Sequence, residues 1–344
     1  LRICRPILTY LSEYLQMIFS SEYYREHIRK QAQGTNINNI KKEYLENLFI
    51  PLPPLKEQKR ILSKVEKLIP FINKYGNIEV ELNNLNNNFP EEIKKSILQE
   101  AIQGKLVPQD PNDEPASILL KRIKEEKEQL IKDKKIRRNK NESFIYRENN
   151  HFYEKFTKTG KIKCIDGDIP FDIPENYMWC RLRNILTKLT DGAHKRPKYV
   201  DDGIPFLSVK DISGRKLDFS DTKFISEEDF EILYNRCNYE KGDILLTKVG
   251  TTGIPVIINT DKQFGLFVSV ALLKFNHEFI FNEYLKYLIE SPLVQNQCDE
   301  NTKGVGNQNW VLRDINNTLI ALPPLDEQKR IVEKLDNIFT NLNL

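Results

Sequence analysis

The stretch PPLKEQKRI at residues 53–61 occurs again as PPLDEQKRI at residues 323–331, with eight of nine positions identical. The two stretches lie 270 residues apart, and the correspondence extends in both directions at this offset without gaps. Upstream matches are Tyr14 with Tyr284, Leu15 with Leu285, Ser21 with Ser291, Gly34 with Gly304, and Asn39 with Asn309. Solenoid repeats have periods of about 20–50 residues. The much longer period here indicates two copies of a module made of a domain and a helix.

The position of the second copy predicts where the first copy should begin. If the second domain opens near Ile169, the first would open about 100 residues before Leu1, which is not a methionine. We therefore expect the chain to be N-terminally incomplete or a natural truncation. Residues 1–54 would then be the C-terminal remainder of a first domain.

A helix is expected after each PPL, because proline is well tolerated where a helix begins and its missing N–H would have no partner. After Arg60, apolar residues recur at spacings of three and four, as in a coiled coil. They are Ile61, Val65, Leu68, Ile72, Tyr75, Leu82 and Phe89. Pro70 and Gly76 interrupt this pattern and predict a kink or a late start, since an interior proline costs about 3 kcal/mol.

The middle of the chain, residues 55–140, is expected to be a central helical region. Residues 91–103 have helical character and end at Gly104, a suitable residue just beyond a helix. Residues 108–115 are rich in turn formers, and residues 116–140 are typical of a charged helix. Residues 141–168 are polar and are expected to be a linker.

Residues 169–322 are expected to form a domain that mixes helices and strands. Apolar, β-branched runs predict strands at residues 204–209, 243–247, 254–258 and 266–275. Helices are expected at residues 227–235 and 281–290, and residues 323–344 would begin a distal helix. The predicted fold class is therefore α+β: a mixed α/β domain with long spacer helices that form a coiled-coil-like pair, internally duplicated.

Composition limits the class of protein. Of 344 residues, 40% are hydrophobic and 29% charged, which is typical of a soluble globular protein. No apolar run approaches the roughly 18 residues that span a bilayer, so no membrane partner is expected. The five cysteines are scattered without metal-ligand spacing, which indicates a reducing, cytoplasmic compartment. The net charge of +3 is too small to indicate a nucleic-acid partner, so any basic surface must be local.

These features together resemble the specificity (S) subunits of type I restriction-modification systems. The resemblance rests on the repeated PPLxEQKRI, on EEIKKSILQEAIQGKLVPQDPNDEPASILLKRIKEEK at 91–127 and on IPFDIPENYMWCRL at 169–182. GDILLTKVGTTG at 242–253 and GNQNW at 306–310 complete the pattern. The resemblance covers nearly the whole chain.

The resemblance implies target-recognition domains separated by conserved helices. Each domain would read one half of a bipartite site in double-stranded DNA. The helices would dock modification (methyltransferase) subunits and, through them, the restriction subunit, an ATP-dependent translocase and nuclease. In this family catalysis belongs to those other subunits, so we expect no enzymatic activity and no cofactor. Because only part of the first recognition domain is present, we expect this chain to read half of the site.

One loop of the second domain, at residues 190–198, gathers basic residues beside Gly192. Arginine and lysine can bind phosphates or guanine edges. The candidates in this loop are His194, Lys195, Arg196 and Lys198. Lys210 follows a predicted strand and is a further candidate. The alternatives are a solvated loop and an ordinary surface lysine.

Two more loops contain candidates for DNA contact. Lys248, Thr251 and Thr252 lie between glycines, where free backbone amides suit phosphate binding, although a structural turn is the alternative. The GK[ST] element of a P-loop is absent. The other loop holds Lys303, Asn307, Gln308 and Asn309, and amide side chains can read adenine. The first copy also has amides at this offset, so a turn-forming role is the alternative.

The two EQKR segments are candidates for docking partner subunits. The residues are Glu57, Gln58 and Arg60 in the first copy, and Glu327, Gln328 and Arg330 in the second. A purely intramolecular role is the alternative. A separate basic run at residues 121–140 holds ten Lys or Arg against four acids. It is interpreted as a solvated helix or linker, with non-specific phosphate contact as the alternative.

The sequence contains no convincing catalytic motif. The four histidines, at 27, 151, 194 and 277, are spread apart and indicate neither a zinc site nor a Ser-His-Asp triad. Two other interpretations stay open. The chain could be a fragment of a fused restriction-methylation enzyme, or a silent truncated copy with a structural or recombination role.

Overall fold

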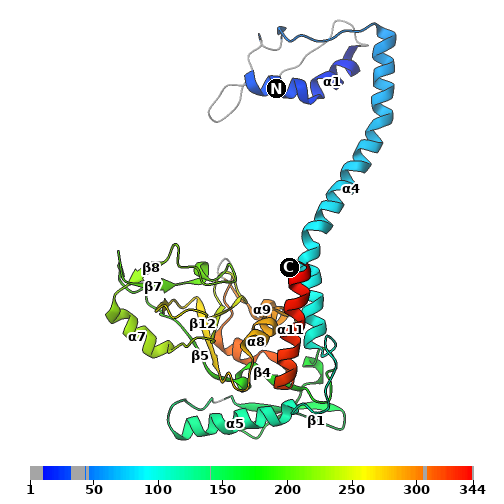
Figure 1. The fold of residues 1–344 in the computed structure, drawn as a ribbon. Helices are drawn as coiled ribbons and strands as arrows, with labels where there is room; N and C mark the ends of the chain where they lie inside the picture. Colours follow the sequence, from blue (N-terminus) through cyan, green and yellow to red (C-terminus); the bar gives the residue numbers. More distant parts are fainter. Residues whose placement is uncertain (1–10, 32–42, 44–45, 140, 305–307, 343–344) are drawn as a thin grey trace. The chain divides into compact units, whose positions relative to one another are not determined.

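The structure is a computed structural model that describes residues 11–31, 43, 46–139, 141–304 and 308–342. The chain divides into two compact units, residues 1–89 and residues 90–344 (Figure 1), and we describe each by itself. Helix α4, Leu55–Ile102, contributes residues to both.

The first unit is helical in its described part. Helices α1 (Ser12–Ser20) and α2 (Glu22–Gln31) precede α4. Their buried core consists of Tyr14, Ile18 and Tyr24, with side chains from the segment before α4 and from its first turns packed against it. The Tyr14 hydroxyl donates a hydrogen bond to the Pro51 carbonyl at 3.1 Å. This bond holds the chain that leads into α4 against α1.

Helix α4 is continuous through Pro70, Gly76 and Pro90. It begins at Leu55, directly after Pro54, so the late start considered from the sequence is not observed. The apolar side chains at heptad spacing are largely exposed along its middle. These exposed residues include Leu68, Ile72, Tyr75, Leu82 and Phe89.

The second unit repeats these helices at the offset of 270 residues. Helices α8 (Asn282–Glu290) and α9 (Pro292–Asn301) match α1 and α2 residue for residue, and α11 (Leu325–Leu342) begins where α4 does. The side-chain hydrogen bonds recur as well. In each, a side chain donates to a backbone carbonyl. The tyrosine bonds are Tyr14 to Pro51 (3.1 Å) and Tyr284 to Ala321 (3.2 Å), and the serine bonds are Ser21 to Ile18 (2.7 Å) and Ser291 to Leu288 (2.6 Å). The glutamine bonds are Gln58 to Pro53 (2.8 Å) and Gln328 to Pro323 (3.2 Å). The duplication predicted from the sequence is confirmed.

Two four-stranded sheets lie in the described part of the second unit. The order of the first is β10–β9–β12–β5, with bounds β5 Leu186–Asp191, β9 Ile244–Thr247, β10 Pro255–Ile257 and β12 Val270–Phe275. The second has the order β11–β7–β8–β6, with bounds β6 Tyr199–Val200, β7 Ile204–Leu207, β8 Lys223–Ile225 and β11 Gly265–Leu266. The predicted strands are confirmed, except that the run at 266–275 is divided between β11 and β12. The mixed α+β class is confirmed.

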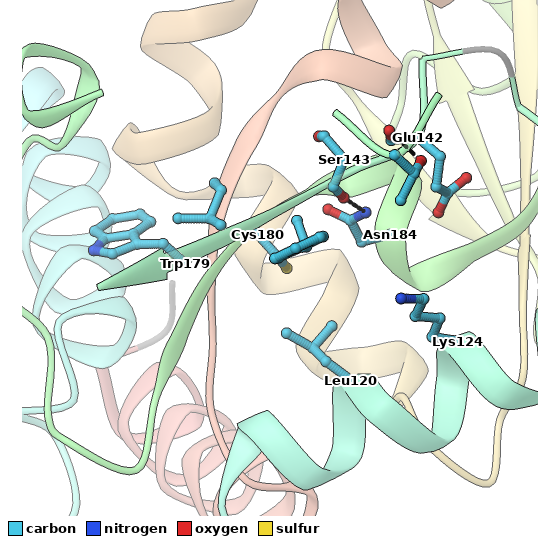
Figure 2. A pocket seen from close by; sticks show the side chains of 10 residues that line it. Leu120, Lys124, Glu142, Ser143, Trp179, Cys180 and Asn184 are labelled. Carbon is cyan, nitrogen blue, oxygen red and sulfur yellow. Dashed lines mark hydrogen bonds between the residues drawn. The ribbon is translucent and has the colours of Figure 1, made fainter. Parts of the chain in front are cut away.

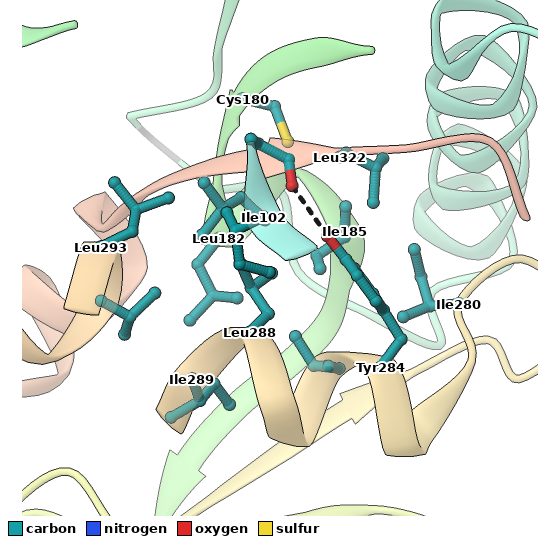
Figure 3. Packing of buried hydrophobic residues seen from close by; sticks show 14 of the residues in the cluster. Ile102, Cys180, Leu182, Ile185, Ile280, Tyr284, Leu288, Ile289, Leu293 and Leu322 are labelled. Carbon is teal, nitrogen blue, oxygen red and sulfur yellow. Dashed lines mark hydrogen bonds between the residues drawn. The ribbon is translucent and has the colours of Figure 1, made fainter. Parts of the chain in front are cut away.

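The main core lies between helices and a two-stranded ladder. Strand β4 (Met178–Arg181) pairs antiparallel with β13 (Leu319–Leu322), and the buried Tyr284 hydroxyl donates to the Ala321 carbonyl beside it (Figure 3). Ile102, at the end of α4, is buried in the same cluster as Leu288 and Leu293. Burying such a side chain fully contributes about 1.5–3 kcal/mol. The remaining helical elements of this unit are η2 (Asp166–Asp168), α6 (Leu182–Ile185), η3 (Val209–Asp211), α7 (Glu227–Cys237) and α10 (Leu312–Asn317).

The segment expected to be a linker is folded. After α5 (Ala116–Lys132), strands β1 (Ser143–Glu148), β2 (His151–Phe156) and β3 (Ile162–Cys164) form an antiparallel sheet. Asn149 and Asn150 have φ values of 50° and 64°, as a tight two-residue hairpin turn requires. The buried face of this hairpin includes Glu154, whose carboxylate accepts hydrogen bonds from Arg181 and Arg183. The linker prediction was wrong because the buried face of this segment includes a charged residue, so its sequence is as polar as that of a solvated linker.

The hairpin packs against α5 and β4 around a small cavity. The cavity has a volume of about 70 Å³ and is lined by residues that include Leu120, Ser143, Trp179 and Asn184 (Figure 2). The Asn184 side chain, which lines the cavity, donates to the Ser143 carbonyl at 2.8 Å. None of the candidate DNA-contact residues lines it. Among the described helices, none is both long and apolar enough to cross a membrane.

Candidate nucleic-acid interface

The candidate loops emerge from one end of the β10–β9–β12–β5 sheet. Ala271 of β12 lies opposite Asp191 at the end of β5 and opposite Leu246 near the end of β9. Both flanking strands are antiparallel to β12, so their carboxyl ends meet at the same edge. The 192–198 loop follows β5 and the 248–253 loop follows β9.

Backbone hydrogen bonds join the 248–253 loop to the segment at 303–310. The Gly250 amide donates to the Gln308 carbonyl at 2.9 Å, and the Trp310 amide donates to the Lys248 carbonyl at 2.8 Å. Lys303 and Asn309 exchange two further backbone bonds. The structure therefore brings together two candidate loops that are well separated in sequence.

The side chains of these two loops differ in exposure. Thr251, Lys303 and Gln308 are exposed, whereas Thr252 is half-buried. Asn309 is half-buried, and its side-chain oxygen is buried without a hydrogen-bond partner in the described structure. The candidate Asn307 lies outside the described residues.

Lys210 lies on η3, which is attached to the same edge. The Val209 amide donates to the Ser269 hydroxyl at 3.1 Å, and the Ser269 carbonyl accepts from the Lys248 amide at 2.9 Å. The Lys210 ammonium pairs with the Asp221 carboxylate at 2.8 Å, and this hydrogen bond raises the pKa of Lys210. Its positive charge is therefore already partly compensated.

A buried carboxylate, Asp191, organises the base of the interface. Its two oxygens contact the guanidinium of Arg236 at 2.7 Å, the ring of His194 at 3.2 Å and the ammonium of Lys248 at 3.4 Å. The Lys248 side chain is only 5% exposed, so it supports the loops from beneath and does not project into solvent. Arg236 and Lys248 together outweigh the single carboxylate, which leaves a positive charge under the loops.

Arg236 was not among the residues predicted from the sequence. It lies in the last turn of α7, 45 residues after Asp191, and its guanidinium also donates to the Asp191 carbonyl at 3.0 Å. No short motif links the two residues. Only the packing of α7 against β5 brings them together.

The exposed cations of the 192–198 loop complete the interface. Lys195, Arg196 and Lys198 are exposed, and none has a carboxylate within 4 Å among the described residues. The loop begins with Gly192, where a Cβ atom would lie 2.0 Å from the Leu266 carbonyl oxygen. This close approach of two backbones requires glycine. It fixes the start of the loop while its basic tip stays free to meet an anion.

Helix α9, one of the helices that repeat at the offset of 270 residues, is hydrogen-bonded to the 248–253 loop. Gln295 of α9 donates its side-chain amide to the Gly253 carbonyl at 2.8 Å and to the Ile289 carbonyl at 2.6 Å. Gly253 has a φ of +82°, a conformation that favours glycine. The repeated helices therefore position a loop of the candidate interface.

The second EQKR segment is used inside the chain. Glu327 is fully buried and accepts hydrogen bonds from Gln109 at 2.6 Å and from Tyr177 at 2.7 Å. Burial raises the pKa of Glu327 in spite of these bonds. The Gln328 side chain accepts from the Phe281 amide at 2.9 Å, and the Arg330 guanidinium donates to both Asp113 oxygens, at 2.6 and 3.2 Å. These contacts favour the intramolecular role for this copy.

The first EQKR segment has fewer contacts. Glu57 and Arg60 form an ion pair at 2.9 Å, with the Arg60 side chain 77% exposed. Gln58 is buried and donates to the Pro53 carbonyl, but its side-chain oxygen has no partner in the described structure. Of the two copies, the first leaves its charged residues accessible to a partner.

Metal ligands are not clustered at the interface in its described part. No cluster of three or more His, Cys, Asp or Glu in the described residues could hold a metal ion. Burial raises the pKa of the Cys237 thiol, which donates to the Asp191 carbonyl, to about 11. The arrangement is suited to binding an anion.

Known proteins match this chain along most of its length. A family described as "Type I restriction modification DNA specificity domain" matches residues 6–84 and 174–344. The specificity subunit of the type I restriction enzyme EcoAI from Escherichia coli is 28% identical, over 100% of this chain and 62% of that protein. The EcoEI specificity subunit, also from Escherichia coli, is 24% identical over 98% and 62%.

A solved structure is similar too. The HsdS subunit from Thermoanaerobacter tengcongensis has 18% sequence identity and a TM-score of 0.40, over 96% of this chain and 63% of that chain. The chain spans less than two thirds of the length of these relatives. Because the family match covers more than half of its residues, the chain belongs to the type I restriction modification DNA specificity family.

Proposed function

We propose that this chain is a DNA-recognition subunit of a type I restriction-modification complex. Its second recognition domain reads one half of a bipartite site in double-stranded DNA, and its helices dock modification subunits. Methyl transfer and cleavage belong to the partner subunits, and this chain contributes no catalytic group. The observation that carries the proposal is the convergence of three candidate loops and η3 at one sheet edge, above the Asp191 cluster.

The charges of this edge suit DNA. Lys195, Arg196 and Lys198 have no acidic partner among the described residues, so they can bind phosphate oxygens without breaking an ion pair. The loop tips at Thr251 and Gln308 add hydroxyl and amide groups, which can contact phosphates and base edges. Phosphate contacts would fix the register of the domain on the duplex, and contacts to base edges would select the sequence.

Docking is proposed to use the first copy of EQKR. Glu57 and Arg60 are accessible there, while Glu327 and Arg330 of the second copy are engaged within the chain. A partner that offers a carboxylate to Arg60 and a hydroxyl or amide to Glu57 would reproduce the contacts of the second copy.

The test of DNA recognition is the variant Lys195→Ala/Arg196→Ala, measured in complex with modification subunits. We expect affinity for target DNA to fall at least tenfold, because the variant cannot form two charge-assisted hydrogen bonds that together contribute about 1.5 kcal/mol or more. Assembly with the modification subunits should be unchanged. Unchanged affinity would remove this loop from the interface.

A matched control is Lys158→Ala/Lys161→Ala. These lysines are exposed on the turn between β2 and β3, and their removal changes the net charge by the same amount. DNA affinity should stay within about twofold of wild type. An equal reduction in both variants would mean that net charge, and not the loop, determines binding.

A further inference from the structure

A basic groove lies between the end of α5 and strand β5. It has a volume of about 640 Å³ and is lined on one side by residues 135–139 and on the other by residues 186–189. Asn316 of α10 also lines it. One side of the groove comes from the basic run at residues 121–140. For this run the sequence allowed two interpretations, a solvated helix or linker and non-specific phosphate contact.

Part of the charge in this groove is compensated. Lys127 pairs with Glu142 at 3.2 Å, and Arg183 pairs with Glu154 at 2.8 Å. Arg138 is bound by Glu128. Glu142 is the carboxylate that lines the groove, and it is already engaged by Lys127.

Three cations of the groove have no carboxylate partner among the described residues. Lys135 and Arg137 are exposed and make no ion pair there. Lys188 is half-buried on β5, and its ammonium donates to the Cys237 carbonyl at 3.2 Å. Burial lowers the pKa of Lys188. An anion in the groove would compensate all three charges and offset the desolvation cost of Lys188.

We propose that this groove binds the phosphodiester backbone of DNA beside the half-site. The proposal rests on the proposed function, because it places a second contact for the same duplex. Strand β5 leads from Lys188 directly to Asp191 at the base of the candidate interface. Three residues of strand span about 10 Å, close to the rise of three base pairs. A groove of this size, with arginine, lysine and asparagine side chains, suits a run of phosphates more than a single small anion.

The test is the salt dependence of DNA binding by the variant Lys135→Ala/Arg137→Ala/Lys188→Gln in complex with modification subunits. The slope of log affinity against log salt should become shallower by about 0.9 for each phosphate that is no longer neutralised, so by about 2–3 in total. Target and non-target duplexes should weaken by the same factor, because binding to the phosphate backbone carries no sequence information. The double variant Lys135→Ala/Arg137→Ala changes only exposed side chains and should give about two thirds of the effect even if the triple variant folds poorly.

Duplex length supplies a second readout. On duplexes shortened in three-base-pair steps from either side of the target, the difference between wild type and variant should vanish once the DNA no longer reaches the groove. The Lys158→Ala/Lys161→Ala variant should keep the wild-type slope. An unchanged slope in the double variant would overturn the proposal. Loss of binding to modification subunits in the double variant would also overturn it, because the groove would then hold a protein.

Failure of the proposed function has a different signature. If the wild-type complex binds target and non-target duplexes equally, sequence recognition fails. The groove still predicts a shallower slope in the variants on any duplex, so the two outcomes can be told apart.

Discussion

The two copies of PPLxEQKR have the same local structure and different surroundings. In both, the glutamine side chain donates to the carbonyl of the first proline, and the tyrosine of the preceding helix pair donates to a backbone carbonyl 37 residues later. In the second copy the glutamate is buried against Gln109 and Tyr177. In the first copy the Glu57 side chain is 40% exposed and pairs with Arg60.

This difference distinguishes the contacts that the motif makes within its own module from the contacts that it makes with residues outside the module. The contacts within a copy come from residues of the same repeated module, so they recur in both copies. The environment of the second glutamate comes from residues outside the module's helices, which lie 150 and 218 positions away. A nearly identical sequence can therefore form buried intramolecular contacts in one copy and an accessible surface in the other.

The largest expected effect on stability is that of Glu327→Ala. It would leave the buried Tyr177 hydroxyl without its acceptor, which costs about 1–3 kcal/mol. Glu57→Ala removes only an exposed ion pair and should change the free energy of unfolding by less than about 0.5 kcal/mol. Urea denaturation of both variants measures the contrast, and equal destabilisation would contradict it.

The pH dependence of stability should also depend on Glu327. Because burial raises its pKa above 4.5, the folded state holds this proton more tightly than the unfolded state does. Its stabilising contribution is complete below pH 4.5 and is lost as the pH rises through the folded pKa. The stability of wild type relative to Glu327→Gln should therefore fall as the pH rises from 4.5. A flat difference, or one that rises, would show that the pKa is not raised.

A smaller effect is expected for Arg330→Ala. This side chain makes two bonds to the buried Asp113 but is itself about one third exposed, so the substitution should cost about 1 kcal/mol. Arg60→Ala should be nearly neutral for stability, since that side chain is solvated. Thermal unfolding of the pair gives the comparison. A larger destabilisation by Arg60→Ala would mean that the first copy has stabilising contacts of its own.

Much of the fold could be predicted from periodic and repeated sequence. The duplication was evident because identical residues recur at one offset, and the strands at 244–247 and 270–275 were evident because they are short, apolar and β-branched. The β1–β2 hairpin was missed. Its interior contains Ser143 and Glu154, which are hydrogen-bonded to each other, and Glu154 accepts further bonds from the distant Arg181 and Arg183.

The loops of the candidate site could be predicted from the sequence, but their convergence at one sheet edge could not. Glycines and basic residues marked the loops at 192–198 and 248–253. Their convergence depends on the register of β5 and β9 against β12, which sequence alone does not give. For the same reason the ion pairs of Asp191 with Arg236 and Lys248 could not be foreseen.

The central claim is that the second recognition domain binds one half of a bipartite DNA site in a sequence-specific manner. Its most direct test is methylation mapping of the genome in cells that carry the modification subunit with and without this gene. We predict that one bipartite methylated motif disappears when the gene is absent, and that Lys195→Ala/Arg196→Ala weakens methylation of that motif. An unchanged set of methylated motifs in the absence of the gene would contradict the account.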